Sequence, residues 1–134
     1  MAIKVEKKDK NKNILIFEFQ VLNHLKGKTP HASFTTLVGL KHVPNVYDFV
    51  HNSEQNLIVM DLMGINLAKA RRCLEQTYSL KIAIHILIEM LAAIREVHER
   101  GFIHRDVKAS NFVLCRNSRR IYIVDFGLAK RHLD

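Results

Sequence analysis

Two short polar runs flank a predicted β-hairpin near the end of the chain, and they constrain the fold more than any other feature. The first run, residues 104–111, reads His-Arg-Asp-Val-Lys-Ala-Ser-Asn, and the second, residues 125–127, reads Asp-Phe-Gly. Between them lie two apolar runs, 112–114 and 121–124, separated by a basic turn at 116–120. Apolar runs joined by a short polar turn predict antiparallel strands. Since a hairpin brings its outer ends together, we expect the two polar runs to converge on one point.

The residues expected at this point suit phosphate chemistry. Asp106 and Asn111 come from the first run and Asp125 from the second. Such hard oxygen ligands favour Mg²⁺ over Zn²⁺, and nearby Lys108 adds a positive charge suited to a phosphoryl group. Phosphoryl transfer depends mostly on positioning and charge neutralisation, so the set matches its needs. For each residue alone, a structural role in a turn is the better explanation, but the two runs together, in this order and spacing, favour the chemical interpretation.

Composition limits the class of protein. The 134 residues suit one domain, and nearly half are apolar, so the chain can bury a core. The densest apolar region, 80–97, contains several charged residues, which excludes an ordinary transmembrane helix. The N-terminus has no signal-peptide pattern, and Cys73 and Cys115 lack a metal-binding spacing. We therefore expect an intracellular protein with reduced thiols, in the cytoplasm or the nucleus, and no membrane partner.

The formal charge of +8 raises the question of an anionic partner. The basic residues are scattered along the chain, and no aromatic residues alternate with them as a stacking surface for bases would require. Nucleic acid is therefore not an expected partner. Electrostatic attraction of an acidic or phosphorylated protein substrate is the favoured explanation of the charge.

Helical periodicity predicts two main helices. The first covers residues 14–25 and is ended by Gly27, with Pro30 just beyond. The second covers residues 80–100 and is followed by Gly101. It carries a wide apolar face composed of Ile84, Leu87, Ile88, Leu91, Ile94 and Val97.

Shorter elements fill the rest of the chain. We expect strands at 2–6, 46–50 and 56–62, with a polar turn at 51–55 between the last two. A short helix at 67–76 would be capped by Asn66. Residues 29–40 give the weakest pattern and predict a loop with a short strand at 34–38.

The two polar runs resemble the signature of the eukaryotic protein kinase catalytic domain. That resemblance implies an α+β, bilobal fold, present here in part, with residues 1–62 in the N-lobe and 63–134 in the C-lobe. It further implies that Asp106 accepts the proton of the substrate hydroxyl and that Lys108 contacts the γ-phosphate of ATP. Asn111 and Asp125 would hold Mg²⁺. Lysine at position 108 is typical of serine/threonine kinases.

The same resemblance gives roles to residues in the first half of the chain. Lys4 would bind the α- and β-phosphates of ATP, held by an ion pair with Glu18 on the first helix. The adenine ring would meet Met60 at the gatekeeper position, backbone groups from Asp61 to Met63, and the side chains of Ala2 and Val113. Without the resemblance, Lys4 and Glu18 would be ordinary surface residues, and Met60 and Val113 ordinary core residues.

Three phrases, at 61–67, 109–112 and 125–130, resemble the casein kinase 1 superfamily. Residues 21–27, together with Lys26-Gly27-Lys28, are nearest to its tau-tubulin kinase branch, although the stretch 29–45 is longer than that branch normally has. The resemblance covers the central portion of a kinase domain. The sequence shows no glycine-rich loop before residue 1 and no activation segment after residue 134, so we expect the chain alone to be marginally stable and catalytically weak. A non-catalytic pseudokinase or interaction fragment is the alternative to an ATP- and Mg²⁺-dependent kinase.

Overall fold

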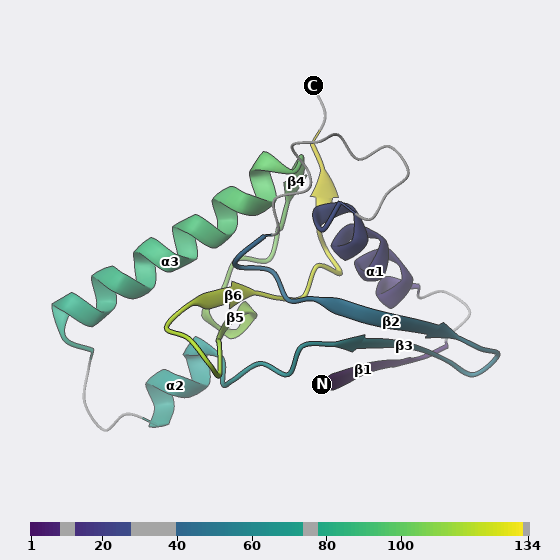
Figure 1. Cartoon of the computed structure of the whole chain (residues 1–134), viewed down its shortest axis with the longest axis horizontal. Coiled ribbons are helices and arrows are strands. Elements are labelled where there is room, and N and C mark those ends of the chain that lie inside the picture. Colours follow the sequence, from purple (N-terminus) through teal and green to yellow (C-terminus); the bar gives the residue numbers. More distant parts are fainter. Residues whose placement is uncertain (9–12, 28–39, 74–77, 133–134) are drawn as a thin grey trace.

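The structure is a computed structural model that describes residues 1–8, 13–27, 40–73 and 78–132. The strand predicted at 34–38 lies outside these residues. The described elements, in chain order, are β1 (Ala2–Lys7), α1 (Ile14–Leu25), β2 (Val46–His51), β3 (Gln55–Met60), α2 (Leu67–Cys73), α3 (Leu80–Glu99), β4 (Phe102–Ile103), η2 (Ala109–Asn111), β5 (Phe112–Leu114), β6 (Ile121–Ile123) and β7 (Lys130–Arg131). In Figure 1 the three strands β1–β3 and helix α1 lie on one side, α3 lies on the other, and β5 and β6 lie between them.

Strands β1, β3 and β2 form an antiparallel sheet in that order, with β3 in the centre. The polar turn between β2 and β3 forms because the side chain of Asn52 accepts hydrogen bonds from the backbone N–H groups of Glu54 and Gln55. The three predicted strands are therefore confirmed, with β3 shifted by one residue at its start and ending at Met60. The register pairs Lys4 with Ile58, and β1 is an edge strand whose Ile3 and Val5 are exposed.

Helix α1 packs on this sheet and occupies the predicted residues. Its contact side is formed by Leu15, Val21, Leu22 and Leu25, while Ile14 and Phe17 are partly exposed. Phe19 stacks on Phe49 of β2 with ring centroids 4.4 Å apart. The helix ends as expected at Gly27, whose φ of 69° is the left-handed conformation that glycine adopts most easily.

Helices α2 and α3 follow the sheet. As predicted, the Asn66 side chain caps α2 by accepting a hydrogen bond from the N–H of Lys69 at 2.8 Å. Helix α3 begins after Ser79, whose hydroxyl accepts a hydrogen bond from the N–H of Ile82. This cap was not predicted from the sequence. At its other end Gly101, with φ of 78°, stops the helix as predicted.

The two sides of α3 differ sharply in burial. Ala93 and Val97 are fully buried, and Ile86, Met90 and Ile94 pack against the core. The remaining apolar residues of the predicted face stay exposed: Ile84 at 48%, Leu87 at 56%, Ile88 at 58% and Leu91 at 65%. The pattern therefore correctly predicted a helix with a wide apolar face, but it did not separate the packed side from the exposed one.

The predicted hairpin forms from β5 and β6, which pair Val113 with Tyr122. Its residues Phe112, Ile121 and Ile123 belong to the buried core together with Phe126. A second, two-residue pairing between β4 and β7 brings the segment after α3 next to the segment after residue 127. Among the described helices, none is both long and apolar enough to cross a lipid bilayer.

Candidate active site

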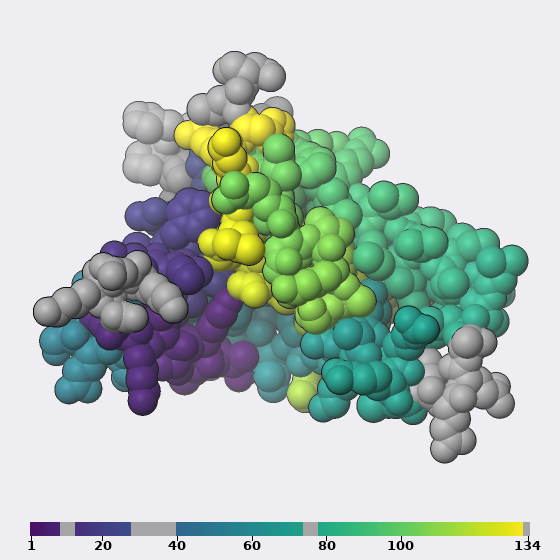
Figure 2. Space-filling model, turned by 180° about the vertical axis from the view of Figure 1, so that it is seen from behind, coloured from purple at the N-terminus to yellow at the C-terminus, as the bar shows by residue number. Residues whose placement is uncertain are grey.

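A cavity of about 380 Å³ lies between the sheet and the β5–β6 hairpin. Strand β1 contributes Ala2 and Lys4, α1 contributes Glu18, and the end of β3 contributes Met60. The other lining residues come from the following segments and the hairpin: Asp61, Met63, Asn66, Ser110, Asn111, Val113, Val124 and Asp125. Residues from the first and last thirds of the chain thus meet here, and Figure 2 shows the purple N-terminal strand beside the yellow C-terminal segment.

Lys4 is the central cation of this cavity. Its Nζ lies 2.6 Å from Glu18 Oε2 and 3.1 Å from Asp125 Oδ1. Burial lowers the pKa of Lys4, but the carboxylates of Glu18 and Asp125 more than offset this effect, so the pKa is raised and the ammonium stays charged. The predicted Lys4–Glu18 pair is therefore present in the structure, with Asp125 as a second partner.

Glu18 is almost completely buried, at 1% exposure. Burial raises the pKa of its carboxyl, and the Lys4 ammonium and a hydrogen bond from the backbone N–H of Phe126 oppose that effect. Because Glu18 contacts both β1 and the segment at 125–127, it connects α1 with both sides of the cavity.

The segment after β4 holds a second group of polar side chains. Lys108 Nζ lies 2.6 Å from Asp106 Oδ2, and this hydrogen bond is the main cause of the lowered pKa of Asp106. The amide nitrogen of Asn111 donates to the backbone oxygen and to Oδ2 of Asp106, both at 2.9 Å. Asp106 is therefore an oriented carboxylate, and the amide oxygen of Asn111 has no partner in the described hydrogen bonds.

The backbone around these residues is held by the motif's own side chains. His104 is buried, its Nε2–H donates to the Val124 carbonyl at 3.0 Å, and its ring packs edge-on to Phe126. Its Nδ1 accepts a hydrogen bond from the N–H of Asp106 at 3.3 Å. Arg105 and Asp125 adopt positive φ angles of 65° and 69°, which cost energy in residues other than glycine. Such backbone strain, at two residues of the same motifs, is typical of functional sites.

The segment after β3 presents backbone groups to the cavity. The N–H of Asp61 is used by the Asn45 carbonyl at 3.1 Å, and its carboxylate accepts hydrogen bonds from the N–H of Asn45 and the hydroxyl of Tyr47. In the described hydrogen bonds, the carbonyl of Asp61 and the N–H of Met63 have no partner. The same is true of both backbone groups of Leu62, so residues 61–63 keep several backbone groups able to bind a base edge, as the prediction for this segment requires.

Two oxygen-bearing side chains of the cavity were predicted to hold Mg²⁺, Asn111 and Asp125. Within the described part of the chain, no three His, Cys, Asp or Glu side chains gather closely enough to hold a metal ion. Asn111 and Asp125 nevertheless line the same cavity beside Lys4. Mg²⁺ is commonly bound by one or two protein oxygens, with phosphates and water completing its shell. The donor set therefore fits Mg²⁺ held jointly with a polyphosphate better than a metal held by protein alone.

Most of the predicted site residues line this cavity, and a few of its lining residues were not predicted. Asp106 and Lys108 pair with each other and do not line it. Asn66, Ser110 and Val124 line the cavity but were not predicted to be site residues. Asn66 forms an isolated β-bridge with Val113, a long-range pairing that no local pattern indicates.

Comparison with known proteins decides the family. The chain matches the protein kinase domain family over residues 1–133. The chain belongs to the protein kinase family. The mixed α and β elements described above are accordingly a partial protein-kinase-like fold, as the sequence predicted.

Relatives of this kinase chain include casein kinase I proteins. It is 36% identical to casein kinase I homolog 3 of Schizosaccharomyces pombe over 78% of this chain and 25% of that protein. It is 32% identical to casein kinase I homolog 2 of the same organism, with the same coverage. A probable serine/threonine-protein kinase of Dictyostelium discoideum is 36% identical over 98% of this chain and 25% of that protein. The chain thus spans about a quarter of the length of these relatives.

Proposed function

We propose that this chain carries the nucleotide-binding and catalytic residues of a serine/threonine protein kinase, which transfers the γ-phosphate of ATP to a hydroxyl of a protein substrate. The observation that supports this most strongly is the meeting of Lys4, Glu18 and Asp125 at the cavity that Asn111 also lines. Three separate segments contribute these groups, so a chance arrangement of turn residues does not account for them. The family match and the names of the relatives agree with the proposal.

Different residues of the cavity would bind the phosphates, the metal ion and the adenine ring. Lys4, kept charged and oriented by Glu18, would bind the α- and β-phosphates. Asn111 and Asp125 would hold Mg²⁺, which when bound would neutralise phosphate charge. Ala2, Met60 and Val113 would contact the adenine ring, with the Asp61 carbonyl and Met63 N–H at its edge.

Asp106 would accept the proton of the substrate hydroxyl. Its lowered pKa keeps the carboxylate ionised, and the bond from Asn111 orients it. Lys108, now paired with Asp106 at 2.6 Å, would also contact the transferred phosphoryl group. In this scheme residues 1–62 form the N-lobe part and 63–134 the C-lobe part of a central kinase portion. The finer assignment to the tau-tubulin kinase branch rests on residues 21–28, and the basic charge supports an acidic or phosphorylated substrate.

The proposal is tested by separating binding from transfer. ATP binding is measured by calorimetry with and without Mg²⁺, for the chain and for Lys4→Met and Asp106→Asn. Transfer is measured with γ-labelled ATP and the peptides Asp-Asp-Asp-Ser-Ala-Ala and Lys-Lys-Lys-Ser-Ala-Ala. We expect Lys4→Met to abolish binding and Asp106→Asn to keep binding and lose transfer, with the acidic peptide preferred. ATP binding without transfer by the unsubstituted chain would favour the pseudokinase alternative, and no binding at all would refute the proposal.

A further inference from the structure

A second cavity, of about 520 Å³, lies between α2, the first half of α3 and the β5–β6 hairpin, and we call it the α2–α3 groove. Its walls are largely apolar and include Ala70 of α2, Ile82 and Ile86 of α3, and Leu114 of the hairpin. It shares no lining residue with the candidate active site. A ligand in the groove would therefore leave that site open.

The rim of the groove is positively charged. Arg119 lines it, and Arg116 and Arg120 belong to the same turn as Arg119. Arg116 donates to the Met63 carbonyl, whereas Arg119 forms no ion pair within the described residues. No carboxylate is among the described residues that line the groove. An anionic group at the rim would therefore meet positive charge and no repulsion from the lining.

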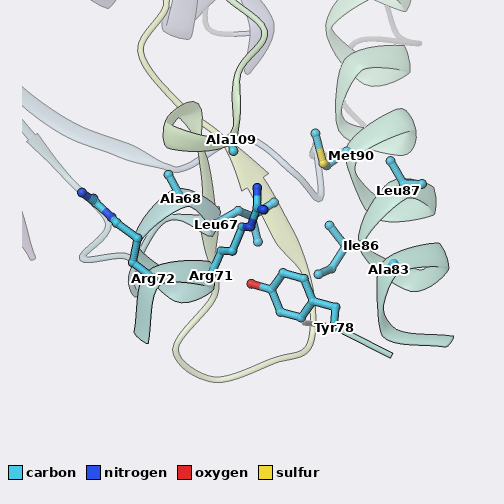
Figure 3. Close-up of a pocket in the computed structure, with 10 residues that line it drawn as sticks. All are labelled: Leu67, Ala68, Arg71, Arg72, Tyr78, Ala83, Ile86, Leu87, Met90 and Ala109. Carbon is cyan, nitrogen blue, oxygen red and sulfur yellow. The ribbon is translucent and has the colours of Figure 1, made fainter. Parts of the chain in front are cut away.

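Tyr78, which lines the groove, carries a buried polar group. Its hydroxyl is buried and has no hydrogen-bond partner among the described residues. Tyr78 also lines a neighbouring cavity of about 610 Å³, and Figure 3 shows its ring between α2 and α3 with the hydroxyl turned toward α2. Because this hydroxyl is covered from solvent, Tyr78 would contribute its ring to the groove and not a hydrogen bond to a ligand.

We propose that the α2–α3 groove docks a short segment of a partner protein in which apolar side chains follow acidic residues. The volume is in the range that holds several apolar side chains. Their burial against Ala70, Ile82 and Leu114 would supply affinity, and the acidic residues would pair with Arg119 at the rim. The inference does not depend on phosphotransfer by this chain.

The test uses the full chain and a fluorescein-labelled peptide, Glu-Glu-Leu-Gln-Leu-Gln-Leu, followed by fluorescence anisotropy. Two comparison peptides replace either the glutamates by lysines or the leucines by glutamines. We expect saturable binding of the first peptide and binding at least about tenfold weaker for either comparison peptide. Equal binding of the lysine peptide, or no saturable binding of the first peptide, would overturn the proposal.

Matched variants locate the site. Arg119→Glu should weaken binding by about five- to tenfold, because it reverses a charge at the rim. Arg120→Glu makes the same change in the same turn, but Arg120 does not line the groove, so its effect should stay below about twofold. Leu91→Gln on the exposed side of α3 should also leave affinity unchanged. An equal loss in Arg120→Glu or in Leu91→Gln would place the peptide elsewhere and refute the groove.

The two cysteines of the chain give an independent readout, since Cys73 and Cys115 both line the groove. Hydrogen bonds from Ser118 and from the backbone of Asn117 lower the pKa of the Cys115 thiol, which favours reaction with N-ethylmaleimide. Saturating peptide should slow this labelling several-fold, as measured by mass spectrometry. An unchanged labelling rate with the peptide bound would show that it lies outside the groove.

Discussion

At the scale of single residues, the Lys4–Glu18 pair joins a half-exposed cation to a fully buried carboxylate. The Lys4 side chain is 40% exposed and that of Glu18 is 2% exposed. Lys4→Met should therefore leave Glu18 as a buried acid without its cation and lower the free energy of unfolding by about 1–3 kcal/mol. The double variant Lys4→Met/Glu18→Gln should recover most of this loss, as measured by urea unfolding. A double variant no more stable than Lys4→Met alone would show that the pair contributes little.

The Lys4→Met variant should also change the pH dependence of stability. Burial already raises the pKa of Glu18, and removing Lys4 takes away the main opposing interaction. A carboxyl whose pKa is raised in the folded state binds its proton more tightly there than in the unfolded chain. The stability of Lys4→Met should thus be greatest below the ordinary Glu pKa and should fall as the pH rises through the raised value. A flat pH profile relative to the double variant would contradict this.

His104 should give the opposite pH dependence. Burial lowers the pKa of its imidazole, although the Val124 carbonyl and nearby carboxylates oppose the shift. The unfolded chain therefore binds a proton at His104 before the folded chain does, so stability should be lost as pH falls below the ordinary His pKa of about 6.5. Protonation of Nδ1 would also break its bond to the Asp106 N–H. Comparing unfolding of the original chain and His104→Gln at pH 7.5 and 5.5 measures the contribution of His104, since His24, the other described His whose pKa is lowered, is present in both.

At the scale of elements, two glycines set how closely segments approach. A Cβ on Gly64 would lie 2.8 Å from the backbone oxygen of Leu114, the same atom that accepts the Gly64 N–H bond. A Cβ on Gly127 would lie 2.6 Å from Cγ2 of Ile14, a partly exposed side chain at the start of α1. We expect both alanine variants to lose about 1–3 kcal/mol of stability. Ile14→Ala should rescue Gly127→Ala but not Gly64→Ala in thermal unfolding, because a backbone atom cannot withdraw in the same way.

The elements also show what local sequence can and cannot predict. The α1 limits, the Asn66 cap and the β5–β6 hairpin were predicted because each depends on residues close in the chain. The buried side of α3, which includes Ala93, was not predicted. It is determined by the packing of α3 on β4 and β6, which the helix sequence alone does not indicate. The network in which Glu96 accepts hydrogen bonds from the backbone of Lys41 and from His42 was missed for the same reason. Lys4 and Glu18 became site residues only through a family resemblance, since neither has a local signal of its own.

At the scale of the whole molecule, the site depends on contacts between distant segments. Asp125 meets Lys4 across 121 positions of the chain, and Leu114 exchanges backbone hydrogen bonds with Gly64 and Ile65. The positive φ of Asp125, a conformation uncommon in residues other than glycine, is adopted within these surroundings. Changes that loosen the contact between α1 and the segment at 125–127 should therefore disturb the site before they unfold either part.

The exposed side of α3 gives a prediction for the chain as a whole. Leu87, Ile88 and Leu91 lie on one helix surface and are each more than half exposed, and Figure 2 shows this helix on the outside of the molecule. Contiguous apolar surface of this kind favours association. The triple variant Leu87→Gln/Ile88→Gln/Leu91→Gln keeps good helix formers, so it should lower self-association in sedimentation velocity while changing unfolding by no more than about 0.5 kcal/mol per site. As a control on the same helix, Val97→Ala removes buried methyl groups and should cost about 1–3 kcal/mol without reducing association. If the triple variant associated as strongly as the original chain, another surface, such as the exposed edge of β1 with Ile3 and Val5, would be responsible.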